Sequence, residues 1–221
     1  MLLDLHDQVV MVLMMLRQNP NQMTIADIFG VSQPTVSRIW RRILPLLEEV
    51  TCLHRVALEE AVKGRVVLVD GTYIPTGNRA STGKDNYSGK RGCQCLSVQV
   101  ASDLDGVLLA VSEPVPGARH DAAAIRLTGW DQLLLDIDWL ADSAYSATTA
   151  TTPERKPPRR PLTKAQKRFN RDVSSLRCAV ERCIAHLKNW KILATGYRGR
   201  LSELPAMIQI TTALELYRLG W

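Results

Sequence analysis

Residues 175–190 read Ser-Leu-Arg-Cys-Ala-Val-Glu-Arg-Cys-Ile-Ala-His-Leu-Lys-Asn-Trp, and this segment contains neither glycine nor proline. It therefore predicts an uninterrupted helix. Leu176, Val180, Cys183 and Leu187 recur at i, i+4, i+7 and i+11, a spacing that places them on one apolar stripe of that helix.

Arg177, Glu181 and Lys188 each directly follow a residue of this stripe, so they lie together on the neighbouring face of the predicted helix. A carboxylate flanked by two cations would then lie beside the buried stripe, where the floor of a site could be. A surface helix with salt-bridged pairs explains the same pattern. A functional role for Glu181 becomes the better explanation only because two more carboxylates stand at the ends of predicted strands.

Those two carboxylates each follow an apolar run. Arg65-Val-Val-Leu-Val-Asp70 is a β-branched run, which suits a central strand buried on both faces. The segment 138–145 predicts a second strand that ends at Asp142. A carboxylate at the end of a buried strand is costly unless it is paired or bound to a metal. The chain thus supplies strand-end Asp70, strand-end Asp142 and helical Glu181, in that order.

Composition limits the class of protein. A chain of 221 residues with 46% hydrophobic and 23% charged residues has the profile of a soluble globular protein. It has no apolar run of 18 residues, so we expect no membrane partner. The net charge of +6 fits a polyanionic partner. Five cysteines without a framework spacing favour thiols over disulfides.

The N-terminal part of the chain predicts a small all-α domain. A helix over 5–18 precedes a short helix (24–29), a break at Gly30 and a second helix with Ser32 as its N-cap. Helix, tight glycine turn and helix is the helix-turn-helix arrangement, although an ordinary helical hairpin has the same pattern. The second helix should expose Gln33, Thr35, Ser37, Arg38, Arg41 and Arg42, and of these we expect Gln33, Thr35, Ser37, Arg38 and Arg41 to contact DNA.

Helical character continues to Lys63 and stops at Gly64. We therefore expect two domains: a helix-turn-helix domain over 1–63 and a catalytic domain over 64–221. Within the second domain, 77–92 reads as a polar loop, and 94–101 with 107–111 as a β-hairpin.

Two further segments carry candidate functional residues. His120 and Asp121 stand at the start of a short predicted helix, where they could cap it or support the carboxylates of a site. The segment 151–171 is strongly basic, and its four prolines keep its first half extended. It could follow a phosphate backbone or form a disordered, solvated loop.

Three separated carboxylates in a basic protein suit phosphodiester chemistry with two metal ions. Mg²⁺ prefers hard oxygen ligands and keeps several waters. Two ions roughly 3.5–4 Å apart can activate an attacking hydroxyl and stabilise the leaving oxygen. Spacing alone is weak support, since many proteins carry strand-end aspartates.

Several motifs make the interpretation more specific. In order, they are Phe29-Gly-Val-Ser-Gln-Pro-Thr-Val-Ser-Arg38, Val69-Asp-Gly-Thr72, Tyr87-Ser-Gly-Lys90, Pro116-Gly-Ala-Arg-His-Asp121, Asp142-Ser-Ala-Tyr145, Pro161-Leu-Thr-x-x-Gln-Lys-x-Phe-Asn170 and Arg177-x₃-Glu181-x₆-Lys188. With these motifs the whole chain resembles bacterial insertion-sequence transposases of the DDE superfamily and the related Harbinger-type nucleases.

The resemblance implies a ribonuclease-H-like mixed sheet flanked by helices. It implies that Asp70, Asp142 and Glu181 bind two Mg²⁺ or Mn²⁺ ions, and that Arg177 and Lys188 order the site or contact DNA. Tyr145 joins His120 and Asp121 as a candidate supporting residue, and Asp121 could replace Asp142 as a ligand. The expected partners are terminal inverted repeats, target DNA and further copies of the chain, in a bacterial cytoplasm beside the nucleoid.

The chain departs from the family pattern around the second aspartate. Related sequences often read Gly-Asp-Lys-Gly-Tyr where this one has Ala141-Asp142-Ser143-Ala144-Tyr145. Alanine in place of glycine at 144 predicts a strained turn, and serine at 143 removes a cation. Ser174 also replaces a tyrosine. Three functions follow: a transposase, a nuclease without strand transfer, and an inactive remnant that at most binds DNA.

Overall fold

The computed structural model describes residues 3–52, 57–77 and 84–220, which fall into two compact units. The first comprises Met1–Arg55 and Leu187–Trp221, and the second comprises Val56–His186. The expected order of N-terminal helices followed by a mixed sheet with flanking helices is confirmed. None of the helices in the described residues is long and apolar enough to cross a membrane.

The first unit begins with the helices of the expected helix-turn-helix: α1 (Leu5–Gln18), α2 (Gln22–Phe29) and α3 (Gln33–Cys52). Asp4 caps α1 and Asn21 caps α2, each by accepting a backbone hydrogen bond with its side chain. Gly30 ends α2 with a φ of 63°, a left-handed conformation that glycine adopts without steric cost. The tight turn predicted from this glycine is present.

The second helix of this pair has the expected two faces. Val36, Ile39 and Ile43 are buried, whereas Arg38 and Arg41 are exposed. The helix α3 is longer than the helix-turn-helix pattern alone requires, because it continues through Pro45 to Cys52. The expected continuation to Lys63 is interrupted: residues 53–56 lie outside the described part of the chain, and a separate short helix, α4 (Leu58–Ala61), follows.

The C-terminal part of the first unit consists of two short 3₁₀ turns, η3 (Lys191–Leu193) and η4 (Leu201–Glu203), and the helix α8 (Leu204–Leu219). The helix α8 contacts α3. The C-terminal segment therefore packs with the N-terminal helices, although we expected it in the catalytic domain by sequence order. The functional boundary near residue 63 stays a prediction.

A buried acid lies at the centre of this packing. Glu215 on α8 is 2% exposed and accepts hydrogen bonds from Trp190 Nε1 (2.8 Å) and Arg218 Nη2 (2.6 Å). Arg17 of α1 stacks over the Trp190 ring at 5.1 Å. Burial alone would raise the pKa of the Glu215 carboxyl, but the hydrogen bonds from Arg218 and Trp190 outweigh it and lower that pKa.

The second unit is built on a six-stranded mixed sheet. Its path is β2 (Tyr87–Ser88), β3 (Cys93–Ser102), β1 (Val67–Pro75) and β6 (Trp139–Leu140), and β4 (Leu108–Val111) and β5 (Val115–Pro116) also pair with β3. The long strands β1 and β3 are antiparallel, whereas β1 and β6 are parallel. The predicted loop 77–92 contains the short β2, and its residues 78–83 lie outside the described residues.

The first predicted strand extends further than expected. Asp70 does not end β1, because Gly71 to Pro75 continue to pair with β3. The parallel partner is much shorter: Val67 pairs with Trp139 and Leu68 with Leu140, after which β6 ends. Asp70 therefore lies just beyond the parallel pairing rather than at a strand end.

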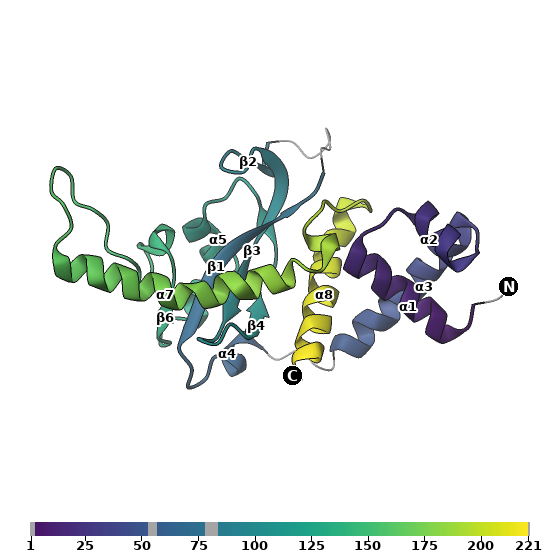
Figure 1. The fold of residues 1–221 in the computed structure, drawn as a ribbon, viewed down its shortest axis with the longest axis horizontal. Helices are drawn as coiled ribbons and strands as arrows, with labels where there is room; N and C mark the ends of the chain where they lie inside the picture. The colour runs from purple at the N-terminus through teal and green to yellow at the C-terminus, as the bar shows by residue number, and fades with distance from the viewer. Residues whose placement is uncertain (1–2, 53–56, 78–83, 221) are drawn as a thin grey trace. The chain divides into compact units, whose positions relative to one another are not determined.

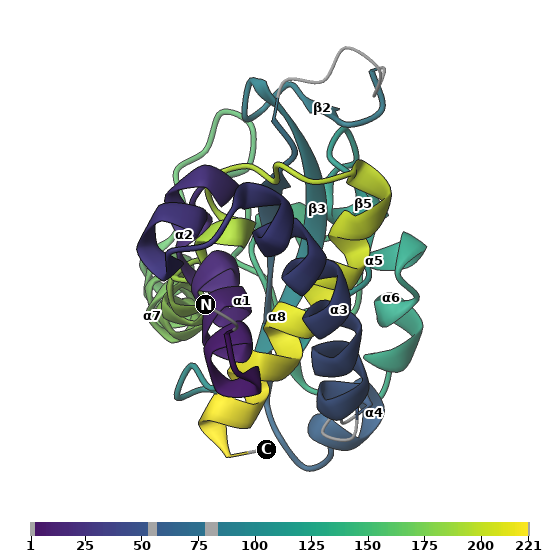
Figure 2. The ribbon, with the colours of Figure 1, turned by 90° about the vertical axis from the view of Figure 1, so that its right-hand side faces the viewer.

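Helices cover both faces of this sheet. The helix α7 (Lys164–Leu187) lies on one face, and α5 (Asp121–Leu127) and α6 (Trp130–Leu133) lie on the other (Figures 1 and 2). The backbone of α7 closely approaches the β3–β4 turn, since a Cβ on Gly106 would meet the Ala179 carbonyl oxygen at 2.8 Å. This contact fixes α7 over the sheet.

The helix α7 corrects the prediction for residues 175–190 in two respects. It begins at Lys164, so the second half of the basic segment is helical, and it ends at Leu187. Val180, Cys183 and Leu187 are buried as predicted, but Leu176 is 43% exposed. The buried stripe begins instead at Val173, seven residues before Val180, which keeps the same helical face.

Because the buried Glu215 accepts hydrogen bonds from Trp190 and Arg218, we expect the free energy of unfolding to depend on pH. Because the folded-state pKa of Glu215 is lowered, its ionisation stabilises the fold above the ordinary pKa of 4.5, and this stabilisation is lost as the pH falls through the folded-state value. Glu215→Ala should cost about 1–3 kcal/mol at pH 7 by leaving the buried Trp190 N–H unpaired. Urea unfolding measures both effects.

Glu49→Gln, at an exposed position of α3, is the control. The stability difference between wild type and Glu215→Gln should shrink between pH 6 and pH 3, whereas Glu49→Gln should follow the wild type throughout. A constant difference for Glu215→Gln would contradict this account.

Candidate active site

A cavity of about 480 Å³ lies against β1 and β3 in the second unit. The rest of its wall comes from the segments around β2 and β5, from the start of α5, from the segment after β6 and from α7. The charged residues that line it are Asp70, Asp121, Asp142, Lys90, Arg91, Arg119, His120 and Arg177. Acidic and basic side chains thus share one cavity.

Asp70 faces α7. Its Oδ2 lies 3.2 Å from Nη2 of Arg177, and both side chains are mostly buried, with 20% and 15% of their surfaces exposed. The backbone N–H of Gly71 donates to Asp70 Oδ1 at 2.9 Å. Burial raises the pKa of the Asp70 carboxyl, opposed by the Arg177 guanidinium. The Nε of Arg177 is buried without a hydrogen-bond partner among the described residues.

Asp142 lies two residues beyond the end of β6, so the predicted strand ends before it, and it caps the 3₁₀ turn η2 (Ser143–Tyr145). Its Oδ1 accepts a hydrogen bond from the Ala144 N–H at 2.7 Å. Extending the parallel pairing of Val67 with Trp139 by three residues places Asp70 opposite Asp142. Both carboxylates line the same cavity.

The expected strain at Ala144 is absent. Among the described residues other than glycine, only Asn19 and Arg159 have a positive φ, so alanine at 144 has ordinary backbone geometry. The cation lost at position 143 has a neighbouring substitute, because Arg155 Nη2 donates to the Ser143 carbonyl at 2.6 Å. The unusual segment around Asp142 is therefore compatible with a formed site.

Asp121 approaches the cavity from the opposite face of the sheet. A Cβ on Gly71 would meet Asp121 Oδ1 at 2.5 Å, so only glycine leaves room for this carboxylate. Burial raises the pKa of the Asp121 carboxyl, Lys90 lowers it, and Asp142 raises it. His120 precedes α5 but makes no capping hydrogen bond with its side chain.

Tyr145 and Gln99 form a buried pair next to Gly71 and Asp121, although neither lines the cavity. Both are fully buried, and the Tyr145 hydroxyl donates to Gln99 Oε1. Burial raises the pKa of Tyr145 well above 10.0, and the carboxylates of Asp121, Asp70 and Asp142 raise it further. The Gln99 Nε2 has no partner in the described residues, so this amide depends on Tyr145 alone.

The structure brings only part of the predicted set together. Asp70, Asp142, Asp121, His120 and Arg177 line the cavity, whereas Tyr145 is buried near Gly71 and does not line it. Glu181 does not line it: its side chain is exposed on α7, four residues after Arg177. Lys188 belongs to the first compact unit, where its Nζ donates to the Leu193 carbonyl at 2.9 Å.

The predicted DNA-facing residues of α3 lie in the first unit. Arg38 donates to Thr35 Oγ1 and to the Pro34 carbonyl, each at 3.3 Å, and its side chain is exposed. Gln33 is partly buried and donates to Gln22 at 2.5 Å. Arg41 is exposed, whereas Ser37 is partly buried. The exposed arginines are therefore the most accessible of this set.

The donor chemistry of the cavity fits Mg²⁺ or Mn²⁺. Its three aspartates offer hard carboxylate oxygens, the ligands that these ions prefer. In the described residues, however, the three do not lie within 4.8 Å of one another.

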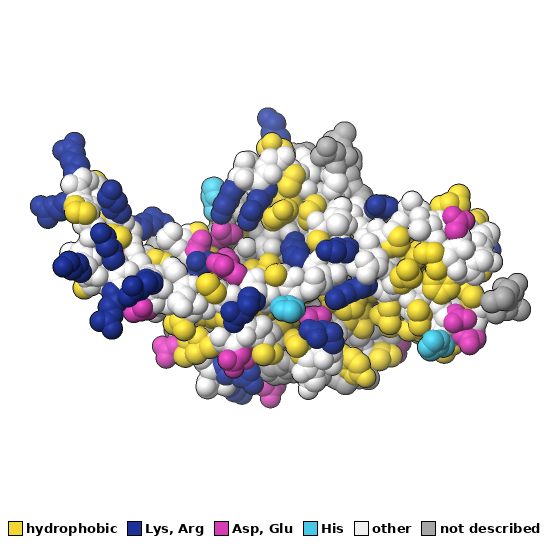
Figure 3. Space-filling model, in the orientation of Figure 1, with side chains coloured by type: hydrophobic (Ala, Val, Ile, Leu, Met, Phe, Trp, Pro, Cys, Tyr) yellow, Lys and Arg dark blue, Asp and Glu magenta, His cyan; other side chains and the backbone are white. Residues whose placement is uncertain are grey.

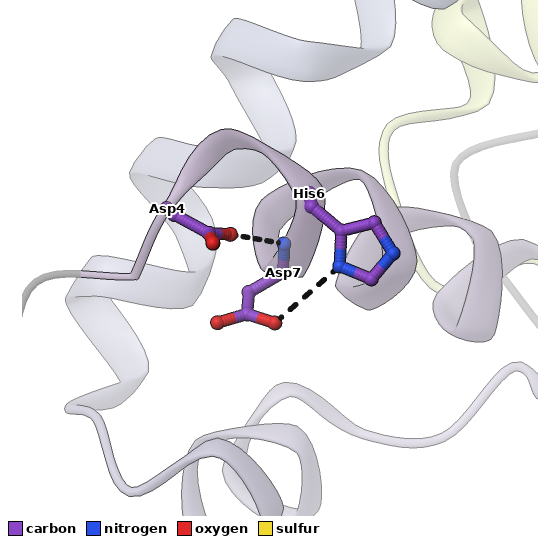
Figure 4. Close-up of side chains that lie close together, drawn as sticks. All are labelled: Asp4, His6 and Asp7. Atoms are coloured by element: carbon purple, nitrogen blue, oxygen red, sulfur yellow. Dashed lines mark hydrogen bonds and ion pairs between the residues drawn. The ribbon is translucent and has the colours of Figure 1, made fainter.

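One tighter group of metal-type ligands occurs elsewhere in the described residues. Asp4, His6 and Asp7 lie within 4.8 Å of one another at the start of α1 (Figure 4). Helix capping explains the group: Asp4 accepts from the Asp7 N–H at 2.8 Å, and His6 Nδ1 lies 3.7 Å from Asp7 Oδ1. Asp4 and His6 are exposed, so no buried charge there needs a metal.

Four residues at or beside the cavity had no role assigned from the sequence. Lys90, Arg91 and Arg119 line the cavity; Lys90 and Arg119 belong to the motifs 87–90 and 116–121, whereas Arg91 lies outside them. Arg91 lies over the Tyr73 ring at 4.7 Å. Gln99 was read as one polar position of an alternating strand; its burial was not predictable from that pattern because helices cover both faces.

Comparison with known proteins adds independent findings. A family model described as "DDE superfamily endonuclease" matches residues 69–215, and one described as "Helix-turn-helix of DDE superfamily endonuclease" matches residues 2–53. The chain is 28% identical over 207 residues to a protein of Microchaete diplosiphon named as the probable transposase for insertion sequence element IS702. That match covers 89% of this chain and 74% of the relative.

A second relative, from Streptomyces albus G, is named for the same role in insertion sequence element IS112. It is 28% identical over 197 residues, which cover 86% of this chain and 72% of the relative. Both relatives therefore match across the helical N-terminal region and the sheet.

The buried hydrogen bond between Tyr145 and Gln99 can be tested by measuring stability. Tyr145→Phe removes the donor to Gln99, which leaves its buried amide without any partner, so the free energy of unfolding should fall by about 1–3 kcal/mol. The double variant Tyr145→Phe, Gln99→Leu replaces both partners by apolar groups and should recover most of this loss. Urea unfolding distinguishes the outcomes; equal losses in both variants would refute the pairing.

Proposed function

Because the chain belongs to the DDE superfamily of endonucleases and carries that family's helix-turn-helix, we propose that it is a DNA transposase. In this proposal it cleaves the ends of an insertion sequence by hydrolysis and joins the resulting 3′-hydroxyl to target DNA. The observation that carries the proposal is that Asp70 and Asp142 line one cavity, which four cationic side chains also line.

Asp70 and Asp142 would hold the divalent ions in this cavity. Bound Mg²⁺ or Mn²⁺ supplies an activated attacking oxygen and stabilises the leaving oxygen. The chain's own contribution is position: Gly71 N–H orients Asp70, and Ala144 N–H orients Asp142. These backbone bonds leave further carboxylate lone pairs for an ion.

The third carboxylate of the proposed set is Glu181. Successive residues of a strand point to opposite faces, and the contact of Asp70 with Arg177 places Asp70 on the α7 face. Glu181 follows Arg177 by one helical turn, so it comes from the same face. Asp121 reaches Gly71 from the other face, which makes it the weaker candidate ligand although it lines the cavity.

The cations of the cavity suit the phosphate groups of DNA. Lys90, Arg91 and Arg119 line it beside the aspartates, and Arg177 is paired with Asp70. A phosphate entering the cavity would give Arg177 a second anionic partner beside Asp70. We therefore assign Arg177 to ordering the site and contacting the substrate backbone.

The helix-turn-helix would recognise the terminal inverted repeats. Exposed Arg38 and Arg41 suit base or phosphate contacts, with Gln33, Thr35 and Ser37 near the start of the same helix. As in the family that the sequence resembles, we expect more than one copy of the chain to assemble on DNA.

The competing function is DNA binding without catalysis. The changes at Ser143 and Ala144 favour it, but Ala144 is unstrained and Arg155 returns a cation to that segment. Metal requirement distinguishes the two, since a regulator of this kind binds DNA without divalent ions. A nuclease without strand transfer is distinguished by whether target joining occurs.

Asp142→Asn tests the proposal most simply. Asparagine retains an oxygen that can accept from the Ala144 N–H but loses the charge that binds an ion, so the protein should stay folded and DNA-bound. Cleavage and strand transfer should fall by about 10³-fold or more, which corresponds to about 4 kcal/mol of transition-state stabilisation. Retained activity would disprove the assignment.

The same assay separates the two candidates for the third ligand. Glu181→Gln should abolish cleavage as severely as Asp142→Asn, whereas Asp121→Asn should reduce it less. The reverse order would assign the third ligand to Asp121.

A further inference from the structure

We infer that residues 153–171, here called the basic arm, bind the phosphate backbone of duplex DNA without regard to sequence, next to the catalytic cavity. The inference rests on the proposed function for the presence of DNA. It adds a second DNA-binding surface, separate from the helix-turn-helix, and assigns it one kind of partner. Figure 3 shows Lys and Arg side chains gathered over this end of α7 and the segment before it.

The charge of the protein is concentrated in the arm. It holds one acid, Glu154, and eight cations: Arg155, Lys156, Arg159, Arg160, Lys164, Lys167, Arg168 and Arg171. The chain has 28 cationic and 22 acidic side chains, so 20 cations and 21 acids remain outside the arm. The arm therefore accounts for the whole positive net charge of the chain.

These cations are available to a partner. All eight are exposed. Among the described residues, Arg171 is the one arm cation with a carboxylate within 4.0 Å, that of Asp172. Charges of one sign that are left unneutralised on a surface repel one another, and they attract a polyanion strongly.

The arm is a formed structure, which contradicts the alternative of a disordered loop. Asn170 holds its start: its Oδ1 accepts from the Glu154 N–H at 2.8 Å, and its Nδ2 donates to the Glu154 carbonyl at 2.9 Å. Gln166 donates to Glu154 Oε2 at 2.5 Å. Thr163 and Gln166 form a capping box that begins α7.

Helical spacing then arranges half of the cations. Lys164, Lys167, Arg168 and Arg171 fall at i, i+3, i+4 and i+7 of α7, which is one face of the helix. This stripe is about 10 Å long at 1.5 Å per residue, and each DNA strand carries a phosphate every 3.4 Å of helix axis. The stripe therefore spans about three phosphates of one strand.

The arm is joined directly to the catalytic cavity. Arg155 Nη2 bonds the Ser143 carbonyl, one residue after Asp142. At its other end, α7 continues from Arg171 without a break to Arg177, which pairs with Asp70. A duplex held on the arm is thus held next to both aspartates.

Salt-dependent binding tests the inference. The full-length chain would be titrated against a 30-bp duplex of unrelated sequence, by fluorescence anisotropy without divalent metal, between 50 and 200 mM salt. The arm variant carries Lys164→Gln, Lys167→Gln, Arg168→Gln and Arg171→Gln. The slope of log K against log salt should become shallower by about 3 to 4, at about 0.9 per lost contact, and affinity at 100 mM salt should fall at least ten-fold.

A control with the same change of net charge isolates the position of the cations. Lys63, Lys191, Arg198 and Arg200 are exposed outside the arm, and their replacement by Gln should change the slope by less than about 1. Equal slopes for the arm variant and this control would overturn the inference. So would an arm variant that keeps its DNA affinity but loses self-association, which would make the arm an interface between copies.

The test also separates this inference from the proposed function. If the wild-type chain cleaves DNA and the arm variant binds like the control, only the inference about the arm fails. If the wild-type chain neither binds nor cleaves DNA, the proposed function fails with it.

Discussion

The parallel pairing of β1 with β6 is the constraint on which the site depends. It involves only two residue pairs, Val67 with Trp139 and Leu68 with Leu140, yet it fixes the relative position of the two strands. Asp70 and Asp142 follow at equivalent positions beyond it. Two carboxylates that are 72 residues apart in sequence thereby share one cavity. The mutual repulsion of the two carboxylates must be offset by positive charge, and Arg177 supplies one such charge next to Asp70.

The features that could be predicted from the sequence are those that depend on local patterns of residues. The glycine turn at Gly30, the buried run before Asp70 and the helical stripe from Val180 to Leu187 all depend on short-range periodicity, and all are present. The family motifs added the order of the elements and the identity of the candidate aspartates. Glu181 was predicted from the same motifs, and its role is still a prediction because its side chain is exposed outside the cavity.

Long-range contacts account for what the sequence did not predict. Pairing with β3 carries β1 past Asp70, and packing against α3 places α8 with the N-terminal helices. The buried pair of Gln99 and Tyr145 depends on which faces of the sheet are covered, which no single strand reveals. The first turns of α7 extend beyond the sheet and carry many charges (Figure 1). They have no buried apolar stripe, so the sequence pattern did not predict that this part of the chain is helical.

The central claim is that the carboxylates around Asp70 bind divalent metal. Calorimetric titration of Mn²⁺ into the wild type and into Asp70→Ala, with and without a DNA duplex, tests it most directly. Asp4→Ala, which alters the exposed group at the start of α1, serves as the control. We predict saturable binding in the wild type and the control, and none in Asp70→Ala. Equal binding by all three proteins, or no binding to the folded wild type even with DNA, would contradict the account.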